Sequence, residues 1–169
     1  FYDKKKWTQP RIRSFLKAVP DNKLILLDYY CDHTEIWRNT EKYYGNPYIW
    51  CYLGNFGGNT MIAGNLNDID FKIKRLFKEG GDNVYGLGAT LEGFDVNPLM
   101  YEFVFDQAWD YPVTTDQWIT NWSMCRGGNQ DANIIKAWRA LHQKIYTEHA
   151  TCGQSVLMNA RPRLKKTKS

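Results

Sequence analysis

The chain has 169 residues, enough for one ordinary domain, with a net charge of +4 and 15% aromatic residues. The excess positive charge lies mainly in lysines close to the two ends, which excludes the basic stripe with interleaved aromatics typical of nucleic-acid binding. The four cysteines form no C-x-x-C pair, which argues against a zinc site. No apolar segment is long enough to cross a membrane or to act as a signal peptide. We therefore expect neither nucleic acid nor a membrane as a partner.

The first third of the chain predicts a helix followed by parallel strands. Apolar residues at helical spacing predict an amphipathic helix over residues 8–19. The apolar run Leu24–Leu27, which ends at Asp28, is typical of a parallel strand buried on both faces. Residues 29–45 form a long connection without a clear period, and such loops are usually either functional or poorly ordered. A second strand is expected at Pro47–Leu53.

The next segment predicts a glycine-rich loop and another strand-plus-helix unit. Residues 54–59 contain three glycines, which favour a close approach of backbone or ligand, but they lack the spacing of a phosphate loop. A helix is expected from Leu66 to Phe77, ending at Gly80 and Gly81. With the strand that follows, three strand-plus-helix units argue for a parallel sheet or part of a barrel.

The segment 84–109 contains the strongest candidate for chemistry. A short apolar strand begins at Val84 and stops at a lone acid, Glu92, after which Gly93 permits a turn. Asn97 is a natural N-cap and Pro98 suits the first helical position. In barrels of such units the chemistry lies at the carboxyl ends of the strands, where Glu92 would stand. The alternative is that Glu92 is a solvated loop carboxylate.

The chain changes character after residue 109. Thr114 and Gln117 predict a capping box at the start of one helix, and Asp131 predicts the start of another. Because no strand separates these helices, we expect an α/β part over residues 1–112 and a helical part over residues 113–169. The last residues, 151–169, are polar and basic, and little regular structure is expected there.

Three motifs resemble the α-N-acetylglucosaminidases, a family of glycoside hydrolases. They are PYIWCYLGNFGGN (47–59), LEG (91–93) and NPLMYE (97–102). The resemblance extends over nearly the whole chain, and it implies part of a (β/α)8 TIM-type barrel followed by the start of an all-helical domain. It also implies a retaining mechanism that removes terminal α-linked N-acetylglucosamine from glycans. Compared with full-length members the chain looks like a fragment that lacks the upstream half of the barrel.

The resemblance implies a role for Glu92 and places its partner elsewhere. By position, Glu92 matches the catalytic nucleophile of the family. A retaining glycosidase also needs a second carboxyl group about 5 to 5.5 Å away, which in the family lies on an earlier strand and would therefore precede Phe1. Asp28 is the alternative at a strand end within this chain, and we interpret it as a pocket or hydrogen-bonding residue rather than the acid.

Three further residues are candidates for substrate binding. Trp50, Cys51 and Asn55 are expected at or just after a strand end, on the same face as Glu92. Trp50 could stack on a sugar ring or pack in the core, and Cys51 suits a small buried position. Asn55, whose amide can donate to and accept from a sugar, is the best of the three. Two-carboxylate chemistry needs neither a metal nor an organic cofactor, and none is predicted.

Two other classes of function remain as alternatives. The chain could be a non-catalytic carbohydrate-binding or interaction module, or a structural α/β domain. If it is a glycosidase fragment, we expect it to be inactive alone, and its open sheet edges predict self-association or loose packing. The family resemblance suggests a secreted, periplasmic or lysosomal protein, although the sequence itself leaves the compartment open.

Overall fold

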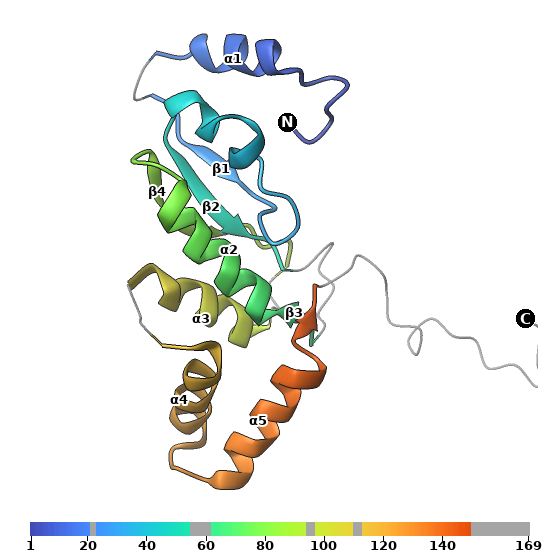
Figure 1. Cartoon of the computed structure of the whole chain (residues 1–169), viewed down its shortest axis with the longest axis vertical. Helices are drawn as coiled ribbons and strands as arrows, with labels where there is room; N and C mark the ends of the chain where they lie inside the picture. The colour runs from blue at the N-terminus through green and yellow to red at the C-terminus, as the bar shows by residue number, and fades with distance from the viewer. Residues whose placement is uncertain (21–22, 55–61, 94–96, 110–112, 150–169) are drawn as a thin grey trace, which may run out of the picture.

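A computed structural model describes residues 1–20, 23–54, 62–93, 97–109 and 113–149 (Figure 1). Most of the glycine-rich loop, including Asn55, and the tail expected to be irregular lie outside these residues. The elements in chain order are α1 (Gln9–Lys17), β1 (Leu26–Asp28), η1 (Trp37–Asn39), η2 (Lys42–Gly45), β2 (Tyr48–Tyr52), β3 (Gly64–Asn65), α2 (Leu66–Glu79), β4 (Val84–Ala89), α3 (Pro98–Asp106), η3 (Gln107–Trp109), α4 (Thr115–Gly127), α5 (Ala132–Lys144) and β5 (Thr147–Glu148).

The predicted parallel sheet is present, with strand order β1-β2-β4. In its register Asp28 lies opposite Trp50, and Trp50 lies opposite Leu87 on β4. Strand β1 begins at Leu26, two residues later than the apolar run. Because all three strands run in the same direction, their carboxyl ends share one edge of the sheet.

Helix α2 covers one face of the sheet (Figure 1). Alternate residues of a strand point to the same side. In β2 the side that faces α2 carries three large aromatic residues, which are all buried: Tyr48, Trp50 and Tyr52. The buried stripe of α2 consists of Leu66, Ile69, Lys72, Ile73 and Leu76. Asn65 caps this helix by accepting from the backbone N–H of Asp68 at 3.0 Å. The aromatic face of β2 and the buried stripe of α2 pack together and form the core between the sheet and the helix.

The opposite face of the sheet is open, so the expectation of a strand buried on both faces is wrong for β1. Ile25 and Leu27 are 53% and 56% exposed, and Tyr85 at the start of β4 is exposed as well. Among the described residues the exposure on this face is uneven, since Cys51 of β2 is buried on the same side. In a closed barrel the inner face is filled by side chains from other strands, which these three strands cannot supply alone.

Residues 29–45 form a packed connection rather than a loose one. They include η1 and η2, and side chains buried in this segment are Cys31, Asp32, Glu35, Ile36, Trp37, Thr40 and Tyr43. The hydroxyl of Thr40 donates to the carbonyl of Ile36 and accepts from the N–H of Tyr43, which fixes the step between the two short helices. This connection supplies several side chains to the site described below.

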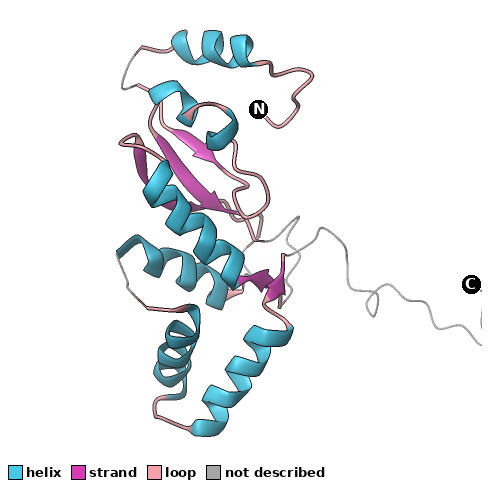
Figure 2. Cartoon of the chain, viewed as in Figure 1, coloured by secondary structure: helices cyan, strands magenta, loops and turns pink. Residues whose placement is uncertain are grey.

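After α3 the described chain is mainly helical (Figure 2). The capping box of Thr114 and Gln117 and the Asp131 cap are both present, as predicted. The chain then returns to the sheet region, where β5 pairs with β3 in antiparallel fashion and the carbonyl of Tyr146 accepts from the N–H of Leu66 at 3.3 Å. Within the described residues, none of the helices has the length and apolarity needed to cross a membrane.

Candidate active site

Glu92 lies just beyond the carboxyl edge of the sheet. Strand β4 ends at Ala89, so the acid stands three residues after the strand rather than at its end. Its side chain is exposed, and Gly93 follows in the same bend. An exposed carboxylate at this edge has the location that barrel enzymes use for chemistry.

Thr90 fixes the segment that leads to Glu92. The N–H of Thr90 donates to the carbonyl of Tyr52 at 3.1 Å, and its hydroxyl donates to the carbonyl of Tyr29 at 2.6 Å. Tyr52 is the last residue of β2, and Tyr29 directly follows β1. The exit of β4 is therefore hydrogen-bonded to the ends of both other strands.

Asp32 fixes the carboxyl end of β2 and was not singled out by the sequence. Its side chain is 1% exposed, and its two carboxylate oxygens accept from the N–H groups of Leu53 at 3.1 Å and Gly54 at 3.2 Å. Gly54 has a φ of +70°, and a Cβ there would lie 2.3 Å from the ring of Tyr52, so glycine is required at this exit. Tyr101 of α3 donates to the carbonyl of Leu53 at 2.5 Å.

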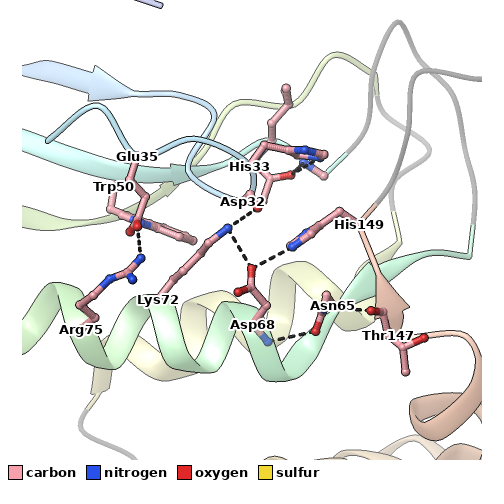
Figure 3. Close-up of polar contacts among 12 residues, drawn as sticks. Asp32, His33, Glu35, Trp50, Asn65, Asp68, Lys72, Arg75, Thr147 and His149 are labelled. Carbon is pink, nitrogen blue, oxygen red and sulfur yellow. Dashed lines mark hydrogen bonds and ion pairs between the residues drawn. The ribbon is translucent and has the colours of Figure 1, made fainter. Parts of the chain in front are cut away.

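A chain of polar groups connects this strand end to α2 and to the segment after α5 (Figure 3). The ammonium group of Lys72 donates to the carbonyl of Asp32 at 2.5 Å and pairs with Asp68 at 2.8 Å. His149 contacts the same carboxylate of Asp68 at 2.8 Å. Burial would raise the pKa of Asp68, but Lys72 and His149 hold it below its usual range. Burial, together with the charge of Lys72, lowers the pKa of His149.

Trp50 lies in the core, not on a sugar-binding surface. Its ring is 0% exposed and its Nε1 donates to Glu35 at 3.1 Å. Glu35 also accepts from Trp37 and pairs with Arg75, so the carboxylate is enclosed by donors (Figure 3). Because neighbouring residues of a strand point to opposite faces of the sheet, the side chain of Cys51 points away from α2.

Asp28 is a buried hydrogen-bonding residue. It lies opposite Trp50 in the register, and its Oδ2 accepts from the backbone N–H of Trp37 at 2.9 Å. The hydroxyl of Tyr2 donates to the other oxygen at 3.5 Å. Burial raises the pKa of Asp28 to about 6. Paired strand residues point to the same face, so Asp28 belongs with the α2 side of the sheet.

Cys51 is buried on the other face, next to β4. Its thiol donates to the carbonyl of Ile49 at 3.6 Å, and the pKa of the thiol is raised to about 11 by burial. A Cβ on Gly88 would lie 3.0 Å from the sulfur and 2.9 Å from the side chain of Ile49, so glycine at this position of the neighbouring strand leaves room for both side chains. No group of three His, Cys, Asp or Glu side chains in the described part of the chain could hold a metal ion.

Comparison with known proteins gives consistent matches. Residues 1–111 match the family model described as the alpha-N-acetylglucosaminidase (NAGLU) TIM-barrel domain, and residues 118–169 match the model of the C-terminal domain of that family. The human alpha-N-acetylglucosaminidase is 31% identical over 144 residues, which are 83% of this chain and 19% of the human protein.

Solved structures of a family 89 glycoside hydrolase from Clostridium perfringens have the same fold. The complex with PUGNAc superposes with a TM-score of 0.76 at 25% identity, covering 94% of this chain and 18% of the other. A second structure of the bacterial enzyme, in complex with its substrate GlcNAc-alpha-1,4-galactose, has a TM-score of 0.76 at 24% identity with the same coverage. The chain is thus part of a TIM-type barrel followed by helices of a further domain, and it spans about a fifth of the length of these relatives.

Proposed function

Because this chain belongs to the alpha-N-acetylglucosaminidase family of glycoside hydrolases, we propose that it supplies the nucleophile-bearing part of a retaining enzyme. That enzyme removes terminal α-linked N-acetylglucosamine from glycans. The names of the relatives support this substrate, since one is an alpha-N-acetylglucosaminidase and another was solved with GlcNAc-alpha-1,4-galactose. Residues 1–112 contribute to the catalytic barrel, and residues 113–169 begin the helical domain.

The observation that carries the proposal is the position of Glu92. Its exposed carboxylate follows β4 at the edge where the three strands end, and Thr90 holds its segment to both neighbouring strands. A nucleophile must reach the anomeric carbon from a fixed direction, so an accessible carboxylate on an anchored segment meets the requirement. In this role Glu92 attacks the anomeric carbon as the bond to the leaving oxygen breaks, and water later hydrolyses the glycosyl-enzyme.

The proton donor comes from a part of the enzyme outside these 169 residues. A retaining glycosidase places the second carboxyl group about 5 to 5.5 Å from the first. Asp28 does not qualify, because its carboxyl group is buried against Trp37 on the helix-covered side of the sheet. In the proposed enzyme the second carboxyl group protonates the departing oxygen and then activates water.

The substitution Glu92→Gln tests the nucleophile. We use a polypeptide of the relatives' length that contains this chain, called the full-length enzyme below, and an aryl α-N-acetylglucosaminide as substrate. Turnover should fall by about 10³-fold or more, because covalent catalysis is lost while the fold and docking persist. Glu79→Gln is the matched control. It removes the same charge from an exposed residue at the C-terminal end of α2. Near-normal turnover of the Glu92 variant would contradict the assignment.

Azide rescue separates a nucleophile from a proton donor. In Glu92→Ala, azide can enter the space of the lost carboxylate and attack the anomeric carbon from the same face. We expect turnover of an activated aryl glycoside to recover with azide and to yield the β-glycosyl azide. The α-glycosyl azide would instead assign Glu92 to the opposite face, as the acid/base.

We also propose that Asn55, which follows Gly54, contacts the N-acetylglucosamine ring. Asn55→Ala in the full-length enzyme should lower kcat/KM, with little change in melting temperature. The loss of transition-state stabilisation calculated from kcat/KM should be about 1 to 3 kcal/mol, the value of one or two hydrogen bonds. A lower melting temperature with unchanged kcat/KM would make Asn55 structural. A contact between Cys51 and the substrate stays a prediction.

The 169-residue chain alone should not hydrolyse glycosides. General acid catalysis typically contributes about 10² to 10⁴ in rate, and half of the pocket is missing as well. The exposed face around Leu27 and the open sheet edges should also cause self-association or loose packing. An aryl glycoside assay and light scattering on one purified sample check both statements. Turnover by a compact monomer would refute them, whereas binding without turnover by the full-length enzyme would favour a carbohydrate-binding module.

A further inference from the structure

We propose that Asp32 is a positioning residue for Glu92, acting through the carboxyl end of β2. This inference rests on the function proposed above and names a residue that the motifs do not contain. It concerns two hydrogen-bonded steps, from Asp32 to the end of β2 and from β2 to Thr90, followed by the two residues of chain from Thr90 to Glu92.

The first step is the clamp on β2. A buried carboxylate that accepts two consecutive backbone N–H groups fixes the direction in which the chain leaves the strand. The hydroxyl of Tyr101 holds the carbonyl of Leu53 from the side of α3. Leu53 is therefore fixed at both its N–H and its carbonyl, by side chains from two different elements.

The second step passes from β2 to the segment of Glu92. Tyr52 directly precedes the clamped pair, and its carbonyl accepts from the N–H of Thr90. A shift of the end of β2 would therefore displace Thr90, and with it the residue two positions further along. The hydroxyl bond from Thr90 to Tyr29 limits the same movement from the side of β1.

The clamping residue, Asp32, is itself fixed by helix α2. Lys72 donates to the carbonyl of Asp32, so the backbone of the acid is fixed as well as its side chain (Figure 3). Lys72 is in turn paired with Asp68, which His149 contacts. Asp32 thus lies between helix α2 and the strand end, which is the arrangement of a support rather than of a group that touches substrate.

The substitution Asp32→Asn in the full-length enzyme tests the inference. A carboxamide keeps one acceptor oxygen but turns its NH₂ group toward a backbone N–H, so one hydrogen bond becomes a repulsive contact. Because small misplacements of a reacting group are costly, we expect kcat to fall by roughly 10- to 100-fold while KM changes by less than about twofold.

Glu35→Gln is the matched control. Glu35 lies in the same connection, is also buried, and also contacts β2 and α2, but through Trp50 and Arg75 rather than through the strand end. It should lower the melting temperature without lowering kcat of the folded enzyme. Equal losses of kcat in the two variants at equal loss of stability would overturn the inference.

Thr90 provides a second test if Asp32→Asn does not fold. Thr90→Val removes the hydroxyl bond to Tyr29 with little change of shape, and Thr90→Ser retains it. We expect Thr90→Val to lower kcat by about 3- to 30-fold and Thr90→Ser to restore most of it. Thr90→Val leaves the N–H bond to Tyr52 in place, so unchanged kcat would show that the exit of β4 can lose one of its two anchors without displacing Glu92, which contradicts the inference.

The result for Glu92→Gln separates this inference from the proposed function. If Glu92→Gln remains active, the proposed function is wrong and Asp32 has no nucleophile to position. If Glu92→Gln is inactive while Asp32→Asn and Thr90→Val keep full kcat, only the positioning role is wrong. Loss of kcat in all three variants, with Glu35→Gln unaffected, supports both proposals.

Discussion

Replacing Trp50 by phenylalanine should destabilise the enzyme without impairing its use of substrate. The ring is fully buried between the sheet and α2, and its Nε1 donates to Glu35 at 3.1 Å. Phenylalanine keeps an aromatic ring in the core but removes the donor and leaves part of the indole volume empty. The expected defect is therefore in folding, not in sugar binding.

The magnitude follows from two contributions. A hydrogen bond to a charged acceptor is worth about 1.5 to 3 kcal/mol, and the lower end applies because Glu35 keeps Trp37 and Arg75 as partners. The lost indole atoms add about 1 to 2 kcal/mol from apolar burial and the cavity left behind. The free energy of unfolding should fall by about 2 to 4 kcal/mol in total.

Thermal unfolding of the full-length enzyme, measured beside kcat and KM for an aryl glycoside, tests this reasoning. Trp37→Phe is the control, because its Nε1 donates to the same oxygen of Glu35 at the same 3.1 Å. Both variants should melt earlier, and neither should change KM by more than about twofold. A raised KM in Trp50→Phe alone, with unchanged melting temperature, would refute the core assignment and restore Trp50 as a sugar contact.

Three further predictions concern stability. Asp28 has a folded-state pKa of about 6, above the ordinary 3.8, because its burial favours the protonated carboxyl group. The contribution of this protonated group to the free energy of unfolding is full below pH 4 and is lost as the pH rises through 6. Asp28→Asn should therefore gain stability relative to the unchanged protein between pH 4 and 7, by up to about 3 kcal/mol, in melting curves across that range. Gly54→Ala should cost more than about 1 to 2 kcal/mol, because φ is +70° and the new Cβ would meet the ring of Tyr52; denaturant midpoints check this. Thr114→Ala should cost about 1 kcal/mol through loss of the capping box with Gln117, whereas Thr120→Ala within α4 should cost less.

Local features of the fold were predictable because their determinants lie within a few residues. The cap at Asp131 and the capping box at Thr114 depend on side chains that bond to backbone two or three positions away. The parallel sheet followed from the succession of apolar runs and helical patterns. The position of Glu92 near a strand end could be predicted from the glycine after it and from the family motif.

The faces of the strands were not predictable in the same way. All five residues of β2 are apolar or aromatic, so no alternation indicates which of them point toward α2. The sequence accordingly left open whether Trp50 packs in the core or contacts a sugar. For β1 the apolar run predicted burial on both sides, but Leu27 is exposed because its covering strands are not part of this sheet.

The support of the site was missed for a different reason. Asp32 contacts Leu53 and Gly54, which are 21 and 22 residues away, and Lys72, which is 40 residues away. Such contacts depend on how the elements pack, and no spacing rule signals them. The one available signal was the density of polar side chains in the connection after β1, which the sequence treated only as a long loop.

The pairing of β3 with β5 has a consequence for synthesis on the ribosome. Asn65 donates to the carbonyl of Thr147, a residue 82 positions later in the chain, and Leu66 bonds to Tyr146 beside it. At roughly 5 to 20 residues per second, about 4 to 16 seconds pass between the emergence of the two partners. Once β4 has emerged within that interval, the first turn of α2 still lacks these acceptors while all three strands of the sheet are available to fold. A ribosome pause within residues 90–146 would prolong the stage at which the open sheet face can meet another nascent chain.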